Sequence, residues 1–139
     1  MKAVNKPCPD CPFSRRVKPG ALGGSKPEAY IGQILGPFVL PCHKHCDFDD
    51  PNWRQSAGDV PQCAGAAMMR YALATSMDLR YPGSIPLLAP TEDALVSLPE
   101  FYAHHTGVSV QQATSYLTFN KLRELLSEQL ARAALGAKP

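Results

Sequence analysis

The placement of the five cysteines among the 139 residues constrains the fold of this chain more than any other feature. Cys8 and Cys11 are separated by two residues in "PCPDCPF", Cys42 and Cys46 lie in "PCHKHC", and Cys63 lies in "QCAG". A Cys-x2-Cys hairpin places two thiolates on one metal ion or cluster, because amides in its tight turn point at the sulfurs. All five cysteines lie between residues 8 and 63, so the pattern predicts loops that converge on a metal centre.

The start of the chain, "MKAVNKPCPD", has no apolar core of the kind that a secretory signal needs. No apolar run approaches the roughly 18 residues of a membrane span. We therefore expect a cytoplasmic protein without a membrane segment, where clustered cysteines bind metal more often than they form disulfides. An odd number of cysteines also argues against a closed disulfide framework.

The prolines and the helical patterns together predict the fold class. All but one of the 14 prolines precede residue 100, which predicts short elements and irregular loops there. Helical patterns cover 25–36, 63–77 and most of the chain from residue 91 onward. We expect a mainly α protein with irregular Cys-bearing loops, a small single domain (1–139) stapled by a four-Cys metal centre. Residues 1–90 would form its Cys-rich metal-binding part and 91–139 its helical part.

Several residues mark the expected helix ends. Thr91 can cap a short helix, and Gly36 and Gly136 can end helices in the left-handed conformation. A further stripe of apolar residues predicts the buried face of the last helix: Phe119, Leu122, Leu126, Leu130 and Ala133. Three pairs have the capping-box spacing: Ser25 with Glu28, Ser97 with Glu100, and Ser109 with Gln112.

The residues alone leave the ligand set open. One set takes four cysteines: Cys8, Cys11, Cys42 and Cys63. Another set pairs the first hairpin with Cys42 and either Cys46 or His45 in a zinc ribbon, and leaves Cys63 as a small core residue. Cys63 opens an apolar helix, whose N-terminal amides and dipole favour a thiolate, so a ligand role for it is expected. His43 and His45 are otherwise expected at the surface.

Four thiolates suit an iron–sulfur cluster and a zinc ion alike. Cys42 follows Cys11 by 31 residues and precedes Cys63 by 21, so ligands arrive singly from different elements. We take a [4Fe–4S] cluster as the first expectation and one zinc ion as the alternative. Four protein thiolates leave no open coordination position for a substrate, and no residue is assigned a catalytic role.

The blocks "PCPDCPFSR", "LPCHK", "CAG" and "SLPEFYAHHTG" resemble a family of short uncharacterised proteins from bacteria and tailed phages. Its pattern is Cys-x2-Cys-Pro-aromatic-Arg, a later Cys-His, then Cys-x-Gly, then a helix similar to "PEFxAHH". The likeness covers 7–107 in scattered blocks and brings no established activity. It implies a phage or bacterial origin and the ligands Cys8, Cys11, Cys42 and Cys63, with Cys46 outside the pattern. In the family the arginine directly follows the aromatic residue, whereas here Ser14 separates Phe13 from Arg15. The resemblance therefore implies no role for Arg15.

The expected function is therefore an iron–sulfur cluster-binding protein with a redox, cluster-dependent or structural role. The alternative is a zinc-stapled module that binds nucleic acid or protein. Residues 1–26 carry six basic residues against one acidic residue, and this basic N-terminus can meet a phosphate backbone through Arg15, Arg16 and Lys18.

A helix-turn-helix motif would support the alternative. Gly107 provides the tight turn, and the following helix would present four polar residues to bases: Gln111, Gln112, Thr114 and Ser115. That helix has no basic residue, so an ordinary αα-corner competes, packed by Phe101, Tyr102, Val110 and Tyr116. His104 and His105 lie at the C-terminus of the first helix, where a histidine cation interacts favourably with the helix dipole.

Overall fold

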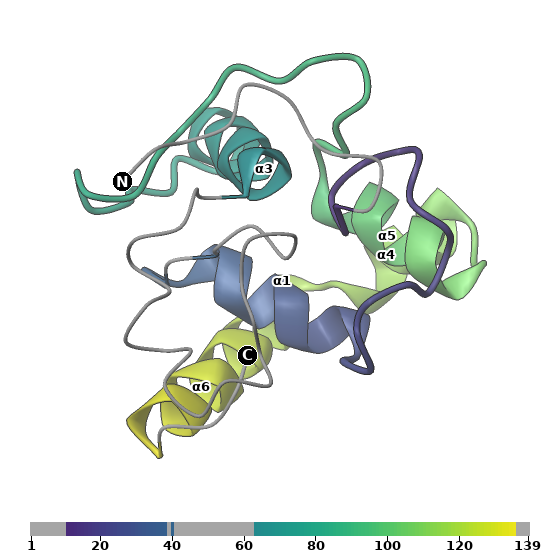
Figure 1. Cartoon of the computed structure of the whole chain (residues 1–139). Coiled ribbons are helices and arrows are strands. Elements are labelled where there is room, and N and C mark those ends of the chain that lie inside the picture. Colours follow the sequence, from purple (N-terminus) through teal and green to yellow (C-terminus); the bar gives the residue numbers. More distant parts are fainter. Residues whose placement is uncertain (1–10, 39, 41–62, 136–139) are drawn as a thin grey trace.

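In the computed structural model, residues 11–38, 40 and 63–135 are described, and they form a small all-α domain. Its five helices are α1 (Pro27–Leu35), α3 (Ala64–Ser76), α4 (Leu98–Thr106), α5 (Val110–Tyr116) and α6 (Phe119–Ala134) (Figure 1). The β-structure of these residues is one isolated bridge, between Ser14 and Ala94. These elements confirm the expected helical class and the expected small single domain. No described helix is long and apolar enough to cross a membrane.

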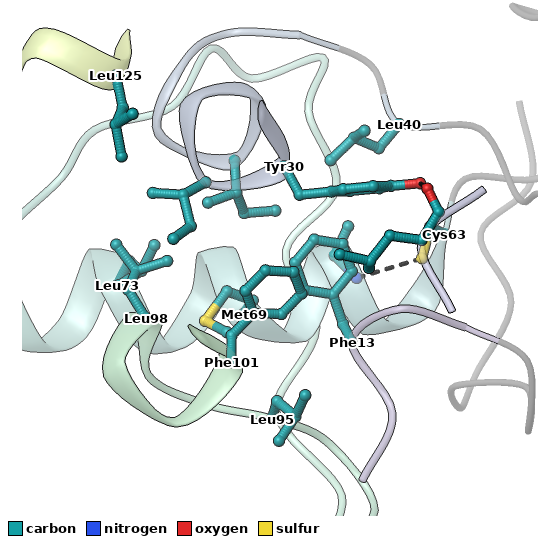
Figure 2. Packing of buried hydrophobic residues seen from close by; sticks show 14 of the residues in the cluster. Phe13, Tyr30, Leu40, Cys63, Met69, Leu73, Leu95, Leu98, Phe101 and Leu125 are labelled. Atoms are coloured by element: carbon teal, nitrogen blue, oxygen red, sulfur yellow. Dashed lines mark hydrogen bonds between the residues drawn. The ribbon is translucent and has the colours of Figure 1, made fainter. Parts of the chain in front are cut away.

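Helix α1 lies at the centre of the described fold and contacts α3, α4 and α6, while α5 packs on α4 (Figure 1). The core fills the space between these helices, and the aromatic rings of Phe13, Tyr30 and Phe101 meet in it (Figure 2). Gly32 allows α6 to approach α1, because a Cβ at this position would lie 2.7 Å from the Leu125 carbonyl oxygen.

The ends of α1 differ from the prediction. The N-cap is Lys26, without a side-chain hydrogen bond, so the capping box expected from Ser25 and Glu28 is wrong. Gly36 follows the helix in an extended conformation with φ −96°, not in the left-handed conformation. Pro27 occupies the first turn, where its missing N–H is not needed.

The C-terminus of α1 is bound instead by the buried side chain of Arg70 from α3, which is 1% exposed. Arg70 Nη2 donates to the carbonyls of Gln33 at 2.9 Å and Gly36 at 3.0 Å, and Nε donates to Ile34 at 3.3 Å. Its guanidinium also lies 5.2 Å from the ring centroid of Tyr81. Burial lowers the pKa of Arg70 to about 10, so it stays protonated at neutral pH and satisfies the last carbonyls of α1.

The segment after residue 90 is less helical than predicted. Residues 91–94 form a turn and the bridge residue, so the short helix expected after Thr91 is wrong. Ser97 caps α4 by accepting from the Glu100 amide at 3.2 Å. The Glu100 carboxylate returns to the Val96 amide at 3.1 Å, one residue before the expected partner.

The α4–α5 corner follows the predicted turn. Gly107 ends α4 in the left-handed region with φ 82°, and Ser109 with Gln112 forms the complete capping box of α5. The rings of Tyr102 and Tyr116 lie 5.0 Å apart, as the αα-corner predicts. Val110 is 53% exposed, so its expected packing role is wrong.

The apolar stripe predicted for α6 is only partly buried. Its buried residues are Leu122, Leu125 and Gln129. Phe119 and Leu130, which the predicted stripe would bury, are exposed. The buried face is turned toward Gly32 of α1, where a smooth helix surface allows close contact. The expected stop at Gly136 lies outside the described residues.

Candidate metal centre

Two of the four predicted ligands meet in the core although 52 residues separate them in sequence. The Sγ atoms of Cys11 and Cys63 lie 3.0 Å apart, and the two residues are only 3% and 8% exposed. Within the described ranges, no group of three or more potential metal ligands forms. The other predicted or alternative ligands lie outside these ranges: Cys8, Cys42, His43, His45 and Cys46.

The backbone of the 94–95 segment holds the loop that carries Cys11. The amide of Leu95 donates to the Phe13 carbonyl at 2.8 Å, and the amide of Arg15 donates to the Asp93 carbonyl at 2.7 Å. These two bonds flank the Ser14–Ala94 bridge. A loop without regular structure is thus fixed two residues after the cysteine.

Two histidines of α4 hold the same loop. His105 accepts from the Gly20 amide through Nδ1 at 3.1 Å, and its Nε2 lies 2.8 Å from the Pro12 carbonyl oxygen. This pair of contacts requires a neutral ring that carries its proton on Nε2. Burial lowers the pKa of His105, which favours that neutral form. His104 Nε2 lies 2.8 Å from the Val17 carbonyl oxygen. The sequence predicted only a helix-dipole role for both histidines and missed this positioning role.

Cys63 is positioned as the N-cap of α3, as the sequence predicted for a cysteine that opens this helix. Its Sγ accepts from the Ala66 amide at 3.4 Å, the dashed line in Figure 2. Its own amide donates to the Leu40 carbonyl at 2.8 Å, which ties the start of α3 to the segment that follows α1. The sulfur therefore lies at the positive end of a helix.

Gly65 makes the approach of the two cysteines possible. A Cβ at this position would lie 2.7 Å from Cys11 Sγ and 2.8 Å from Phe13 Cβ, closer than real contacts allow. Behind the loop, the Phe13 ring stacks on Phe101 with centroids 4.9 Å apart. The Cys-x-Gly spacing thus has a physical reason, because the helix needs a smooth surface beside its cysteine N-cap.

The surroundings favour negative charge on the Cys63 sulfur. The hydrogen bond with Cys11 is the largest cause that lowers the pKa of Cys63; amides of Ala66 and Gly65 and the charge of Arg70 act in the same direction, and burial opposes them. The ring of Tyr30 reaches from α1 toward Cys63 (Figure 2). Burial, and then the charges of the two cysteines, raise the pKa of Tyr30, so its phenol stays protonated.

The predicted nucleic-acid contacts are partly engaged within the protein. Arg15 Nη1 binds the Glu100 carboxylate at 2.6 Å, and Arg16 Nε lies 3.3 Å from a carboxylate oxygen of Asp93. Lys18 is exposed.

On α5, the four residues predicted to face bases are exposed: Gln111, Gln112, Thr114 and Ser115. Gln112 accepts from the Ser109 amide and Thr114 donates to the Val110 carbonyl, so two of these side chains bind their own helix.

Comparisons with protein-family models, with curated proteins and with solved structures found no match to this chain. The likeness to short phage and bacterial proteins therefore stays a hypothesis that depends on its motif residues. Of those residues, Cys11, Cys63 and Gly65 lie against one another, and His105 of the "AHH" block holds the loop of Cys11.

Proposed function

We propose that this chain is a small metal-binding protein whose centre is held by four thiolates: Cys8, Cys11, Cys42 and Cys63. The centre would join the N-terminal loop, the segment after α1 and the start of α3. The observation that carries the proposal is the meeting of Cys11 and Cys63 in the core, 3.0 Å apart at the N-terminus of a helix.

Covalent geometry supports the other two ligands. Cys42 is two residues from Leu40, so their Cα atoms lie within about 7 Å of each other. The Leu40 carbonyl is itself bound to the Cys63 amide at 2.8 Å. Cys8 is three residues from Cys11, which limits that separation to about 11 Å. The chain therefore allows all four thiolates to reach one metal centre.

Charge supports a set of thiolates over a set with histidine. Arg70 is a buried cation, and its partners among the described residues are carbonyls and a tyrosine ring, without a carboxylate. A buried charge is costly unless opposite charge is near. Four thiolates on a divalent ion carry a net negative charge, and the charges of Arg70 and Cys63 act favourably on each other. This complementarity favours Cys42 over His43 or His45 as the ligand from "PCHKHC".

The sulfur separation favours zinc over a cubane. Zinc binds thiolates at about 2.3 Å in a tetrahedron, which places neighbouring sulfurs about 3.8 Å apart. Cys11 and Cys63 need to separate by only about 0.8 Å to reach that spacing. A [4Fe–4S] cluster binds each thiolate through a different iron, so its sulfurs lie further apart. We therefore propose one structural zinc ion, with the [4Fe–4S] cluster as the competing hypothesis.

The proposed role is to stabilise the fold. Cys11 and Cys63 belong to the buried core cluster, and a structural zinc contributes its binding free energy to folding. The nucleic-acid-binding alternative gains less support, because Arg15 and Arg16 already pair with carboxylates. That alternative would regain support if the protein bound DNA or RNA in a salt-sensitive manner and if the double variant Arg15→Ala with Arg16→Ala weakened the binding.

The test is to purify the full chain without oxygen and to quantify zinc, iron and sulfide beside a visible absorption spectrum. We expect a colourless protein with one zinc per chain. Cys11→Ser and Cys63→Ser should each lower the zinc content, whereas Cys46→Ser, outside the family pattern, should keep it. A brown protein with about four irons per chain would favour the cluster. A wild-type protein without either metal would refute the proposal.

A further inference from the structure

The thiol groups of Cys11 and Cys63 lie in direct contact in the described structure. The S–S bond of a disulfide is about 2.05 Å long, so two thiol sulfurs must approach to that distance before the bond can form. Here the two Sγ atoms are 3.0 Å apart, and closure needs an approach of only about 1 Å. The backbone on both sides is fixed, by the Pro12 and Phe13 carbonyls on one side and by helix α3 on the other.

We propose that Cys11 and Cys63 form a reversible disulfide when the protein meets a hydroperoxide, and that this pair is a redox-modification site. The proposal goes beyond the metal centre and does not depend on it, because it needs only these two sulfurs. If a metal occupies the same thiolates, closing the disulfide removes two of its ligands and releases it.

The reaction balances with the hydroperoxide as the two-electron oxidant. The Cys63 thiolate attacks one oxygen of hydrogen peroxide, the O–O bond breaks, and hydroxide leaves and takes up a proton. The product is a sulfenic acid on Cys63. The Cys11 thiolate then attacks the Cys63 sulfur, the S–O bond breaks, and the oxygen leaves as a second water. One S–S bond forms and one peroxide becomes two waters.

The positions of the sulfurs assign the order of these steps. Cys63 lies at the N-terminus of α3, where the Ala66 amide donates to its sulfur at 3.4 Å, so its thiolate is the first nucleophile. Cys11 lies within contact distance and resolves the sulfenic acid before further oxidation. A thiol this close protects Cys63 from the irreversible sulfinic acid.

The experiment uses the full chain as purified without oxygen, exposed to one equivalent of hydrogen peroxide. Remaining thiols are alkylated and the protein is digested with trypsin and an Asp-specific protease. These enzymes leave Cys11 alone in the peptide 10–15 and Cys63 alone in the peptide 59–70, so mass spectrometry identifies their cross-link directly.

We expect the 10–15 to 59–70 cross-link to be the main product and to disappear on treatment with dithiothreitol. The matched variant Cys46→Ser, outside the proposed ligand set, should keep it within about twofold of wild type. Cys11→Ser should abolish it and let dimedone trap a sulfenic acid on Cys63. The proposal is wrong if cross-links of Cys8, Cys42 or Cys46 dominate in the wild-type chain. It is also wrong if Cys63 accumulates as a sulfinic acid without a cross-link. A cross-link in a chain that binds no metal would leave this inference standing and refute only the metal centre.

Discussion

The substitution Gly65→Ala tests whether the smooth start of α3 is what allows Cys11 to reach Cys63. The added Cβ would lie 2.7 Å from Cys11 Sγ and 2.8 Å from Phe13 Cβ. Carbon atoms in good contact are about 3.5–4.0 Å apart, so the loop must move away from the helix by about 0.8 Å.

The loop has little freedom to make that movement. Phe13 is fully buried against Phe101, and its carbonyl is bound by the Leu95 amide. Overpacking in such surroundings costs about 1–3 kcal/mol. The higher helix propensity of alanine offsets at most about 1 kcal/mol of this cost. We expect Gly65→Ala to lower the free energy of unfolding by about 1–2 kcal/mol.

Urea unfolding followed by circular dichroism measures this loss on the full chain as purified without oxygen. The control is Gly83→Ala, because a Cβ at Gly83 would meet nothing within 4 Å. That variant should be neutral or more stable by about 0.4–1 kcal/mol, since alanine restricts the unfolded chain. Gly65→Ala should also lower the yield of the Cys11–Cys63 cross-link. A variant with wild-type stability and an undiminished cross-link would refute the reasoning from this contact.

Three further changes test the supporting contacts. Arg70→Met should lower the free energy of unfolding by about 3 kcal/mol or more, because it removes three hydrogen bonds from a buried cation to the carbonyls at the end of α1. The exposed Arg80→Met should change it by less than about 0.5 kcal/mol in the same urea titration. His105 has a pKa lowered below its unfolded value of about 6.5, so its contribution is complete above that pH and is lost as the pH falls below it. Melting temperatures measured between pH 7.5 and 5 should therefore fall more steeply for wild type than for His105→Gln, which has no proton to gain at the Gly20 contact. Ser109→Ala should remove the α5 cap and cost about 1 kcal/mol in urea, and an unchanged midpoint would contradict the capping role.

Sequence patterns predicted the helices where local signals are strong. The capping box of Ser109 with Gln112, the N-cap at Ser97 and the left-handed turn at Gly107 are all present, because each depends on residues within four positions. The end of α1 could not be predicted in this way. Arg70, 34 to 37 residues away, binds the carbonyls at this end, and Gly36 does not adopt the left-handed conformation. The one signal was a single arginine in an otherwise apolar helical pattern.

At the candidate site, too, local signals were predictable and contacts between distant residues were not. The cysteine spacing and the helix start predicted that Cys63 would be an N-cap near other thiols, and Cys11 is indeed beside it. The spacing alone did not reveal why Gly65 follows Cys63, because that reason lies in the surface offered to a distant loop. The buried face of α6 was predicted only in part: Leu122 is buried, but Leu125 and Gln129, which pack beside Gly32 of α1, were not predicted.

The contacts of the Cys11 loop also show why the cysteine-bearing and helical parts of the chain act together. Residues 11–24 form no helix, and their position depends on side chains and backbone from residues 93–105. His105 binds the carbonyl next to Cys11, and Leu95 binds the one after it. The helical part therefore delivers Cys11 to Cys63, and a change in α4 acts on the sulfur pair without touching either cysteine. A chain cut after residue 90 would keep all five cysteines and still lose the geometry that brings these two together.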